Sequence, residues 1–173
     1  GGPRLGAAVD ADAEGQPTAA ADGDDSNGAT PDDEDGVTLG ALVASATLNM
    51  TGSATVDLQS PDATANVLNA WIDFNRDGDW LDANEQIFTD HSLGTTAGPQ
   101  VLNFTIPAGA AAGTTFARFR LSTATGLAPT GVASNGEVED YPVAITVDTT
   151  PPATGTVTAP DVDQAGAGQT SYQ

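Results

Sequence analysis

The sequence predicts an all-β protein, an antiparallel β-sandwich of the jelly-roll or immunoglobulin-like kind. Short segments in which apolar and polar residues alternate recur along the chain, and turns rich in Gly, Pro and Asp separate them. Ala, Thr, Gly and Val supply much of the sequence, while aromatic residues make up 5% of it. Small and β-branched side chains in this pattern favour packed sheets over a helical bundle. The predicted architecture also includes an acidic N-terminal arm and a C-terminal linker or strand.

The predicted strands are short and closely spaced, as in a sandwich. Between the first two, the segment Thr51-Gly52-Ser53 is expected to form a hairpin turn or a bulge. In a later strand the alternation predicts that Phe119 and Leu121 face the core. The predicted strands span residues 37–48, 54–58, 67–74, 86–88, 99–107, 115–122 and 138–147.

Changes in composition divide the chain into three parts. Residues 1–36 are rich in acids and poor in apolar side chains, which fits either a disordered leader or an arm that packs on the domain and supplies cation ligands. Residues 37–148 hold the predicted sandwich. Residues 149–173 begin as a Pro/Thr linker and continue as the start of a following module. We expect residues 150–173 to pair with a neighbouring module or subunit by strand addition.

The charge of the chain restricts its partners. It carries 24 acidic residues and four arginines, with no lysine, for a formal net charge of −20. Binding to a nucleic-acid backbone needs a basic surface, so nucleic acid is excluded as a natural partner. Such an excess of acids either binds cations or keeps the surface hydrated in a salt-adapted organism. No apolar run is long enough for membrane insertion.

The absence of cysteine excludes disulfides and thiolate chemistry. We expect an extracellular or cell-surface location, where Ca²⁺ at millimolar levels can take the place of a disulfide in stabilising a domain. His91 lies beside Ser92 and Asp90, but adjacent residues do not form a catalytic triad, whose members converge from separate parts of a fold. We therefore expect no enzymatic activity.

One loop carries the pattern of a calcium site. Four oxygen-bearing side chains alternate, at Asp73, Asn75, Asp77 and Asp79, and Gly78 allows a sharp turn. This spacing matches the first half of an EF-hand loop, but Asn84 stands where that loop has its bidentate Glu. Glu85 is taken as the closing ligand, with Asp82 as the other acid in reach. The alternative is a solvated Asp/Gly turn.

Three stretches together resemble the GEVED domain of bacterial surface and secreted proteins. They are DDEDGV at residues 32–37, WIDFNRDGDW at 71–80 and GEVEDYPV at 136–143, and the strand ARFRLS at 117–122 fits as well. The resemblance covers residues 5–148. It implies a β-rich extracellular module, carried beside other repeats in adhesin-like proteins or appended to enzymes, with no defined catalytic activity.

The acids of the first and last of these motifs suggest a second cation site. Since the motifs occur together, their acids are expected to meet in space. They would either surround a shared cation or face Arg118 and Arg120, and two arginines cannot neutralise five acids. The alternative is a turn that leads into a strand and whose acids are solvated. The acids in question are Asp33, Asp35, Glu137, Glu139 and Asp140.

The leading functional hypothesis is a non-catalytic, calcium-stabilised structural or adhesive module of a secreted or cell-surface multidomain protein, such as a fibre or matrix subunit. The alternative is a carbohydrate-binding module appended to an extracellular hydrolase, with extracellular polysaccharide as the partner. That alternative requires exposed coplanar aromatic rings, whereas Trp71 and Trp80 are expected to pack against the loop or the core.

Overall fold

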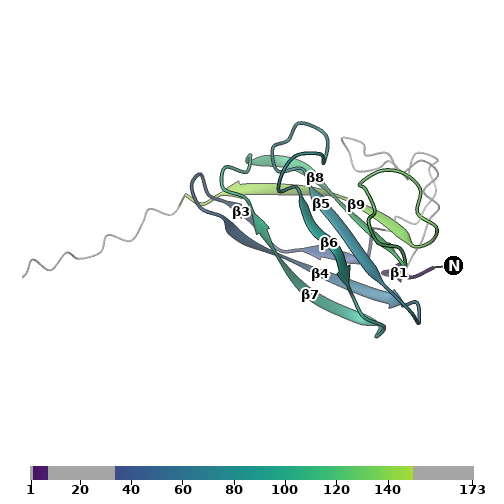
Figure 1. Cartoon of the computed structure of the whole chain (residues 1–173). Coiled ribbons are helices and arrows are strands. Elements are labelled where there is room, and N and C mark those ends of the chain that lie inside the picture. Colours follow the sequence, from purple (N-terminus) through teal and green to yellow (C-terminus); the bar gives the residue numbers. More distant parts are fainter. Residues whose placement is uncertain (1, 8–33, 150–173) are drawn as a thin grey trace, which may run out of the picture.

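The computed structural model describes residues 2–7 and 34–149 and contains β-strands without helices there (Figure 1). The all-β class predicted from the sequence is confirmed. No helix of the described part is long and apolar enough to cross a membrane. The strands are β1 (Arg4–Leu5), β2 (Val37–Leu39), β3 (Leu42–Ala44), β4 (Met50–Ser60), β5 (Val67–Ile72), β6 (Gln86–Ser92), β7 (Gly98–Ile106), β8 (Gly113–Ser122) and β9 (Glu137–Val147).

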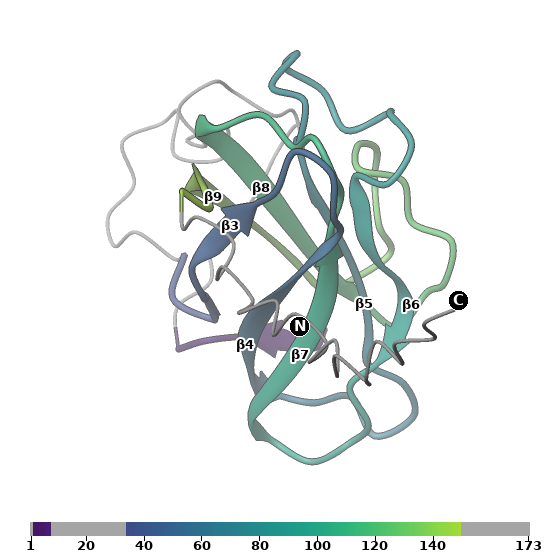
Figure 2. The ribbon, with the colours of Figure 1, turned by 90° about the vertical axis from the view of Figure 1, so that its left-hand side faces the viewer.

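Two sheets pack face to face as a sandwich. In the first sheet β4 pairs with β7 on one side (Figure 2). β1 and β2 lie one after the other along the opposite side of β4. The second sheet has the order β3-β9-β8-β5-β6. Every pair is antiparallel except β3 with β9, which is parallel.

The main core lies between the sheets and follows the alternation of the strands. In β4, Ala54, Val56 and Leu58 point inward and are fully buried, while the residues between them are partly exposed. From the second sheet, Phe119 and Leu121 of β8 reach the same cluster at 0% and 1% exposure, as the sequence predicts. Apolar burial of this kind is the main stabilising contribution to the sandwich.

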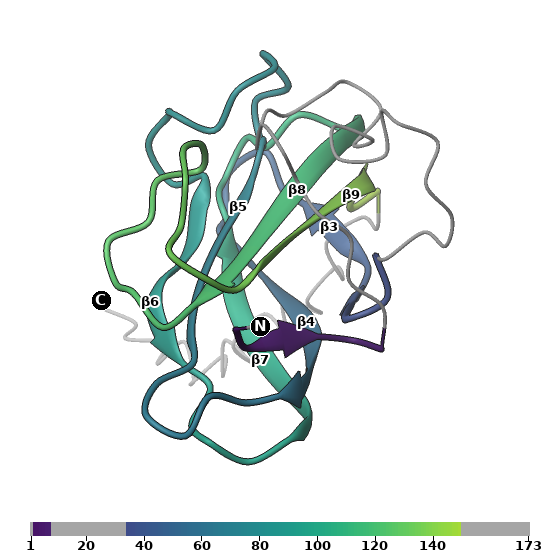
Figure 3. The same cartoon turned by 90° about the vertical axis from the view of Figure 1, so that its right-hand side faces the viewer.

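The two central strands of the second sheet, β5 and most of β8, are buried on both faces. Trp71 of β5 and Phe116 of β8 form a second apolar cluster with Trp80 of the following loop. The connection between β8 and β9 lies beside β5 and β6 (Figure 3), where the Gly126 N–H donates to Asp90 of β6. β5 is therefore buried along its whole length rather than at alternate positions.

Two arginines of β8 hold the β8–β9 connection in place. The Arg118 guanidinium donates to the Pro129 carbonyl, and Arg120 donates to the carbonyls of Ala128, Thr130 and Gly131. The sequence places both residues on the face of β8 opposite Phe119. Their burial results from a connection that folds back over that face.

Two strand predictions were wrong. Residues 37–48 do not form one strand: the chain breaks after Leu39, crosses between the layers, and β3 joins the other sheet beside β9. Residues 51–53 form neither a turn nor a bulge, because β4 runs through them in regular register with β7. Gly52 serves packing there, since a Cβ at this position would lie 2.5 Å from the Phe104 ring.

Part of the predicted arm lies in the sandwich, since β1 belongs to the first sheet. β1, the purple strand at the N-terminus, lies beside β4 (Figure 3). Leu5 pairs with Leu58 and is fully buried in the main core. Residues from the predicted arm therefore complete the sheet. The predicted linker and following module, from residue 150 onward, lie outside the described residues.

Candidate metal centre

The loop between β5 and β6, residues 73–85, is anchored by two buried acids. Asp73 is 1% exposed, and its two carboxylate oxygens accept hydrogen bonds from the N–H groups of Arg76 and Gly78. Glu85 is also 1% exposed and accepts from Phe74 N–H and Asp82 N–H, each at 3.2 Å. These carboxylates bind the backbone of the loop at its base and fix its shape.

A third acidic group lies at the tip of the loop. Carboxylate oxygens of Asp77, Asp79 and Asp82 all lie within 4.8 Å of one another, and the three residues are exposed. Ca²⁺ takes oxygen ligands at 2.3–2.6 Å, so two of its ligands lie at most about 5 Å apart. The spacing therefore fits one cation. This is the one such group of three acidic, His or Cys side chains among residues 2–7 and 34–149, and it could hold a metal ion.

Asn75 links two of these carboxylates. Its amide nitrogen donates to Asp77 at 3.0 Å and to Asp82 at 2.6 Å, while its amide oxygen accepts from the Asp77 N–H at 2.9 Å. In this conformation the Asn75 amide nitrogen is a donor between two anions, and its oxygen accepts one hydrogen bond from the backbone. The Asn75 bond is also the largest cause that lowers the pKa of Asp77, which keeps that acid ionised.

The backbone turns sharply to bring these side chains together. Arg76 and Asn84 have positive φ values of 64° and 74°, and Gly78 has a φ of 97°. Arg76 also fixes the loop to the start of β8, because its guanidinium donates to the carbonyls of Ala112 at 2.8 Å and Thr114 at 3.0 Å. The tip of the loop is thus attached to β8 through the hydrogen bonds of Arg76.

Trp80 packs the loop onto the outer face of the second sheet. Its ring is 4% exposed and meets Phe116 edge to face, with centroids 5.0 Å apart. The Arg118 guanidinium carbon lies 4.8 Å from the Trp80 ring centroid, in cation–π geometry. The expected packing of Trp80 is present.

The converging acids differ from the predicted ligand set, because Asp73 and Glu85 bind the backbone of the loop instead and Asn75 bridges two of the acids. Of the predicted ligands, Asp77 and Asp79 converge, and Asp82 joins them where Glu85 was expected. Glu85 points into the base of the loop, where burial is the main cause that raises its pKa to about 6. The signal for Asp82 was present in the sequence as the second acid in reach, but spacing alone does not distinguish the two.

The acids of the last motif hold the N-terminal segments. Glu137 accepts from Leu5 N–H, and Glu139 accepts from Gly36 N–H at 2.9 Å and from the Tyr141 hydroxyl at 3.0 Å. Asp35 accepts from Ala7 N–H at 2.9 Å. The two motifs do meet in space, as expected, but the contacts are with backbone N–H groups.

Burial dominates the titration of this second cluster. The pKa of Glu139 is raised to about 8, first by burial and then by the charge of Glu137. Burial also raises the pKa of Tyr141, with the charge of Glu139 as the next cause.

Asp140 does not join Glu137 and Glu139, and of the two arrangements expected for these acids it takes the one that faces an arginine. Successive residues of a strand point to opposite faces. Asp140 therefore faces the Arg118 side chain, to which it binds through two hydrogen bonds of 2.7 and 2.6 Å. Asp33 lies outside the described residues.

Fold and loop together define a β-sandwich domain with an acidic loop at one end of its second sheet. Comparison with protein families gave a match to the GEVED domain at residues 67–144, which includes the acidic loop (residues 73–85) and the last motif, GEVEDYPV at residues 136–143, called the closing motif below. Residues 67–144 therefore match the GEVED domain family, and the resemblance seen in the sequence is confirmed over this part of the chain. No curated protein and no solved structure matches the chain.

Proposed function

We propose that the chain is a non-catalytic, calcium-stabilised structural or adhesive module of a secreted or cell-surface multidomain protein. The observation that carries the proposal is the convergence of the Asp77, Asp79 and Asp82 carboxylates within 4.8 Å at the tip of one loop. Like charges held this close repel each other, and a bound cation removes the repulsion. Oxygen ligands of this kind suit Ca²⁺.

The position of the loop connects the cation to the stability of the fold. Its base is bonded through Asp73 and Glu85, and Trp80 packs between it and Phe116. An ion at the tip would therefore restrain a segment that covers the outer face of the second sheet. Chelation is expected to loosen this segment first, because the ligands are the exposed part of the loop.

A carbohydrate-binding role receives less support. Such modules bind sugar rings on exposed aromatic side chains, whereas every Trp and Phe of the described residues is buried and Tyr141 is half-buried. The structural role needs no such platform. Neighbouring modules or subunits of the same protein are the proposed partners, at the cell surface or outside the cell.

The proposal is tested by thermal unfolding in EGTA and in millimolar calcium at matched ionic strength. Calcium at 100 times its dissociation constant stabilises a folded state by about 2.7 kcal/mol per site. For a domain of this size we expect the melting temperature to rise on the order of 5 to 10 °C. Magnesium should raise it less, because it dehydrates reluctantly and demands octahedral geometry.

Two variants control this measurement. Asp77→Ala should remove most of the calcium-dependent shift. Asp62→Ala removes an acid from an ordinary turn, where its carboxylate accepts from the Thr64 N–H and hydroxyl, and should leave the shift intact. Identical melting curves with and without calcium would show that the acidic tip is a solvated turn.

A further inference from the structure

The outer edge of β7 carries backbone groups that no described residue pairs. Two hydrogen bonds show which residues of β4 bond toward β2. The Ser53 C=O accepts from the Gly40 N–H, and the Asp57 N–H donates to the Gly36 C=O, both on the β2 side of β4. Odd-numbered residues of β4 therefore bond toward β2, and even-numbered residues bond toward β7.

The register of the β4–β7 pair then assigns the free groups. Ala54 lies opposite Leu102, so the even-numbered residues of β7 bond to β4. The N–H and C=O groups of Val101, Asn103 and Thr105 point to the open side. Within residues 2–7 and 34–149, β7 has no partner on that side.

β7 lacks the features that protect other sheet edges. β6 has two register shifts and an exposed acid at Asp90, with a positive φ of 47°. β2 and β3 have three residues each. β7 has nine residues in unbroken register with β4 and carries no charge, and Val101 is 69% exposed. Bulges, short strands and charges are the usual means of preventing edge pairing.

Charge limits what can occupy this edge. The chain carries a net charge of −20, so two copies repel each other over most of their surface. The region around β7 is an exception, because β7, β2 and residues 50–56 of β4 are all uncharged. A second copy can approach along this edge without bringing acids into contact.

We propose that β7 of one copy pairs antiparallel with β7 of a second copy, about a twofold axis at Asn103. In this register Val101 lies opposite Thr105 of the second copy, and all outward N–H and C=O groups of these residues are paired. Pro99 and Pro107, which lack an N–H to donate, lie opposite each other at the two ends. Both prolines lie four residues from Asn103, so an axis at Asn103 places them opposite each other. In a neighbouring register a proline would face a residue whose backbone groups need a partner.

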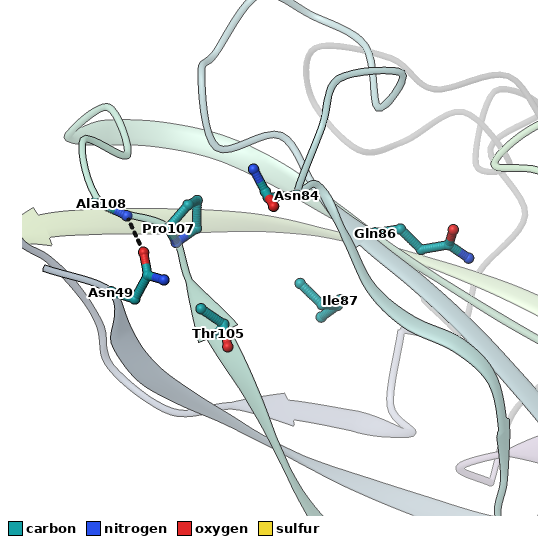
Figure 4. A pocket seen from close by; sticks show the side chains of 7 residues that line it. All are labelled: Asn49, Asn84, Gln86, Ile87, Thr105, Pro107 and Ala108. Atoms are coloured by element: carbon teal, nitrogen blue, oxygen red, sulfur yellow. Dashed lines mark hydrogen bonds between the residues drawn. The ribbon is translucent and has the colours of Figure 1, made fainter.

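Side chains agree with the pairing. Leu102, partly buried at the edge of the core, would contact Phe104 of the second copy on the inner face. A cleft of about 510 Å³ lies beside the end of β7, with Thr105 and Pro107 on one side and Ile87 of β6 on the other (Figure 4). This space lies at the end of β7 that would face Pro99 and Val101 of the second copy. The inference extends the structural role proposed above by naming a partner surface, and it does not depend on calcium.

Cysteine cross-linking tests the axis, because the chain has no cysteine of its own. Two Asn103→Cys residues would have Cα atoms about 5.5 Å apart across a hydrogen-bonded pair. Two Ser53→Cys residues, opposite Asn103 on β4, would be separated by three strand spacings, or about 14 Å. A thiol cross-linker with a reach between these distances should couple the full-length Asn103→Cys chain into dimers and leave Ser53→Cys monomeric.

Charge at the axis provides a second test. Asn103→Asp places two carboxylates face to face and should raise the dimer dissociation constant at least about tenfold, whereas Ser53→Asp adds the same charge away from the axis. Sedimentation equilibrium of the full chain at millimolar concentration and physiological salt measures both. Monomers throughout, or dimers that Asn103→Cys does not capture, would overturn the proposal. Either result leaves the calcium measurement unaffected.

Discussion

The acidic loop and the closing motif are two acid-rich regions that the protein uses in opposite ways. In the closing motif, Glu139 and Asp140 are almost fully buried and bind a backbone N–H and an arginine, respectively. At the loop tip, Asp77, Asp79 and Asp82 are exposed and converge on one another. Buried acids require partners within the protein, whereas exposed carboxylates can remain close together in water or around an ion. The number of acids therefore does not identify a cation site, but their partners do.

The largest effect is expected from breaking the buried ion pair between Arg118 and Asp140 of the closing motif. Asp140→Ala removes the acid that binds Arg118, whose side chain is 2% exposed. Leaving an arginine buried without its acid typically costs about 3–5 kcal/mol. Urea unfolding in EGTA should show a loss of this size. Asp79→Ala, in the exposed tip, should change the free energy of unfolding little under the same conditions, and comparable losses for the two variants would erase the contrast between the regions.

A smaller effect concerns pH and Glu139. Its pKa is raised from 4.5 to about 8, so the folded state keeps a proton that the unfolded chain has already lost. Stability from this group is complete below pH 4.5 and is lost as the pH rises toward 8. Glu139→Gln stays neutral and should be the more stable protein at pH 8, by on the order of 3 kcal/mol, with little advantage near pH 4.

Urea unfolding of wild type and Glu139→Gln across this pH range measures the difference directly. The subtraction removes the contribution of Glu85, whose pKa is also raised and which titrates in both proteins. A difference that is constant with pH would mean that Glu139 is ionised in the folded state.

The fold was predictable where local alternation decides it. Phe119 and Leu121 face the core because β8 alternates against a sheet on that side. The burial of Arg118 was not predictable from its strand, because the covering connection lies ten or more residues further along the chain. Gly52 indicated a turn by its type, yet the Phe104 ring, more than fifty residues away, requires a glycine in a strand.

The candidate site was predictable in location and partly in membership. The alternation from Asp73 to Asp79 correctly indicated a loop that gathers oxygens. Spacing could not show that Asp73 turns back to the backbone, since that depends on the positive φ of Arg76 and Gly78. In the closing motif, the side of β9 that each acid faces decided its partner.

The smallest expected effect separates the two acids that could close the loop. Asp82→Asn alters an exposed residue of the tip and should weaken calcium binding at least about tenfold, while the melting temperature in EGTA stays close to that of the wild type. Glu85→Ala should do the reverse. It leaves the Phe74 and Asp82 N–H groups without the buried carboxylate that accepts their hydrogen bonds, at a cost of about 1–2 kcal/mol with or without calcium. Calcium titration by calorimetry, combined with melting in EGTA, resolves the two effects. If Glu85→Ala abolished binding while Asp82→Asn left it intact, the ion would be held at the base of the loop and the exposed tip would be only a cluster of acids.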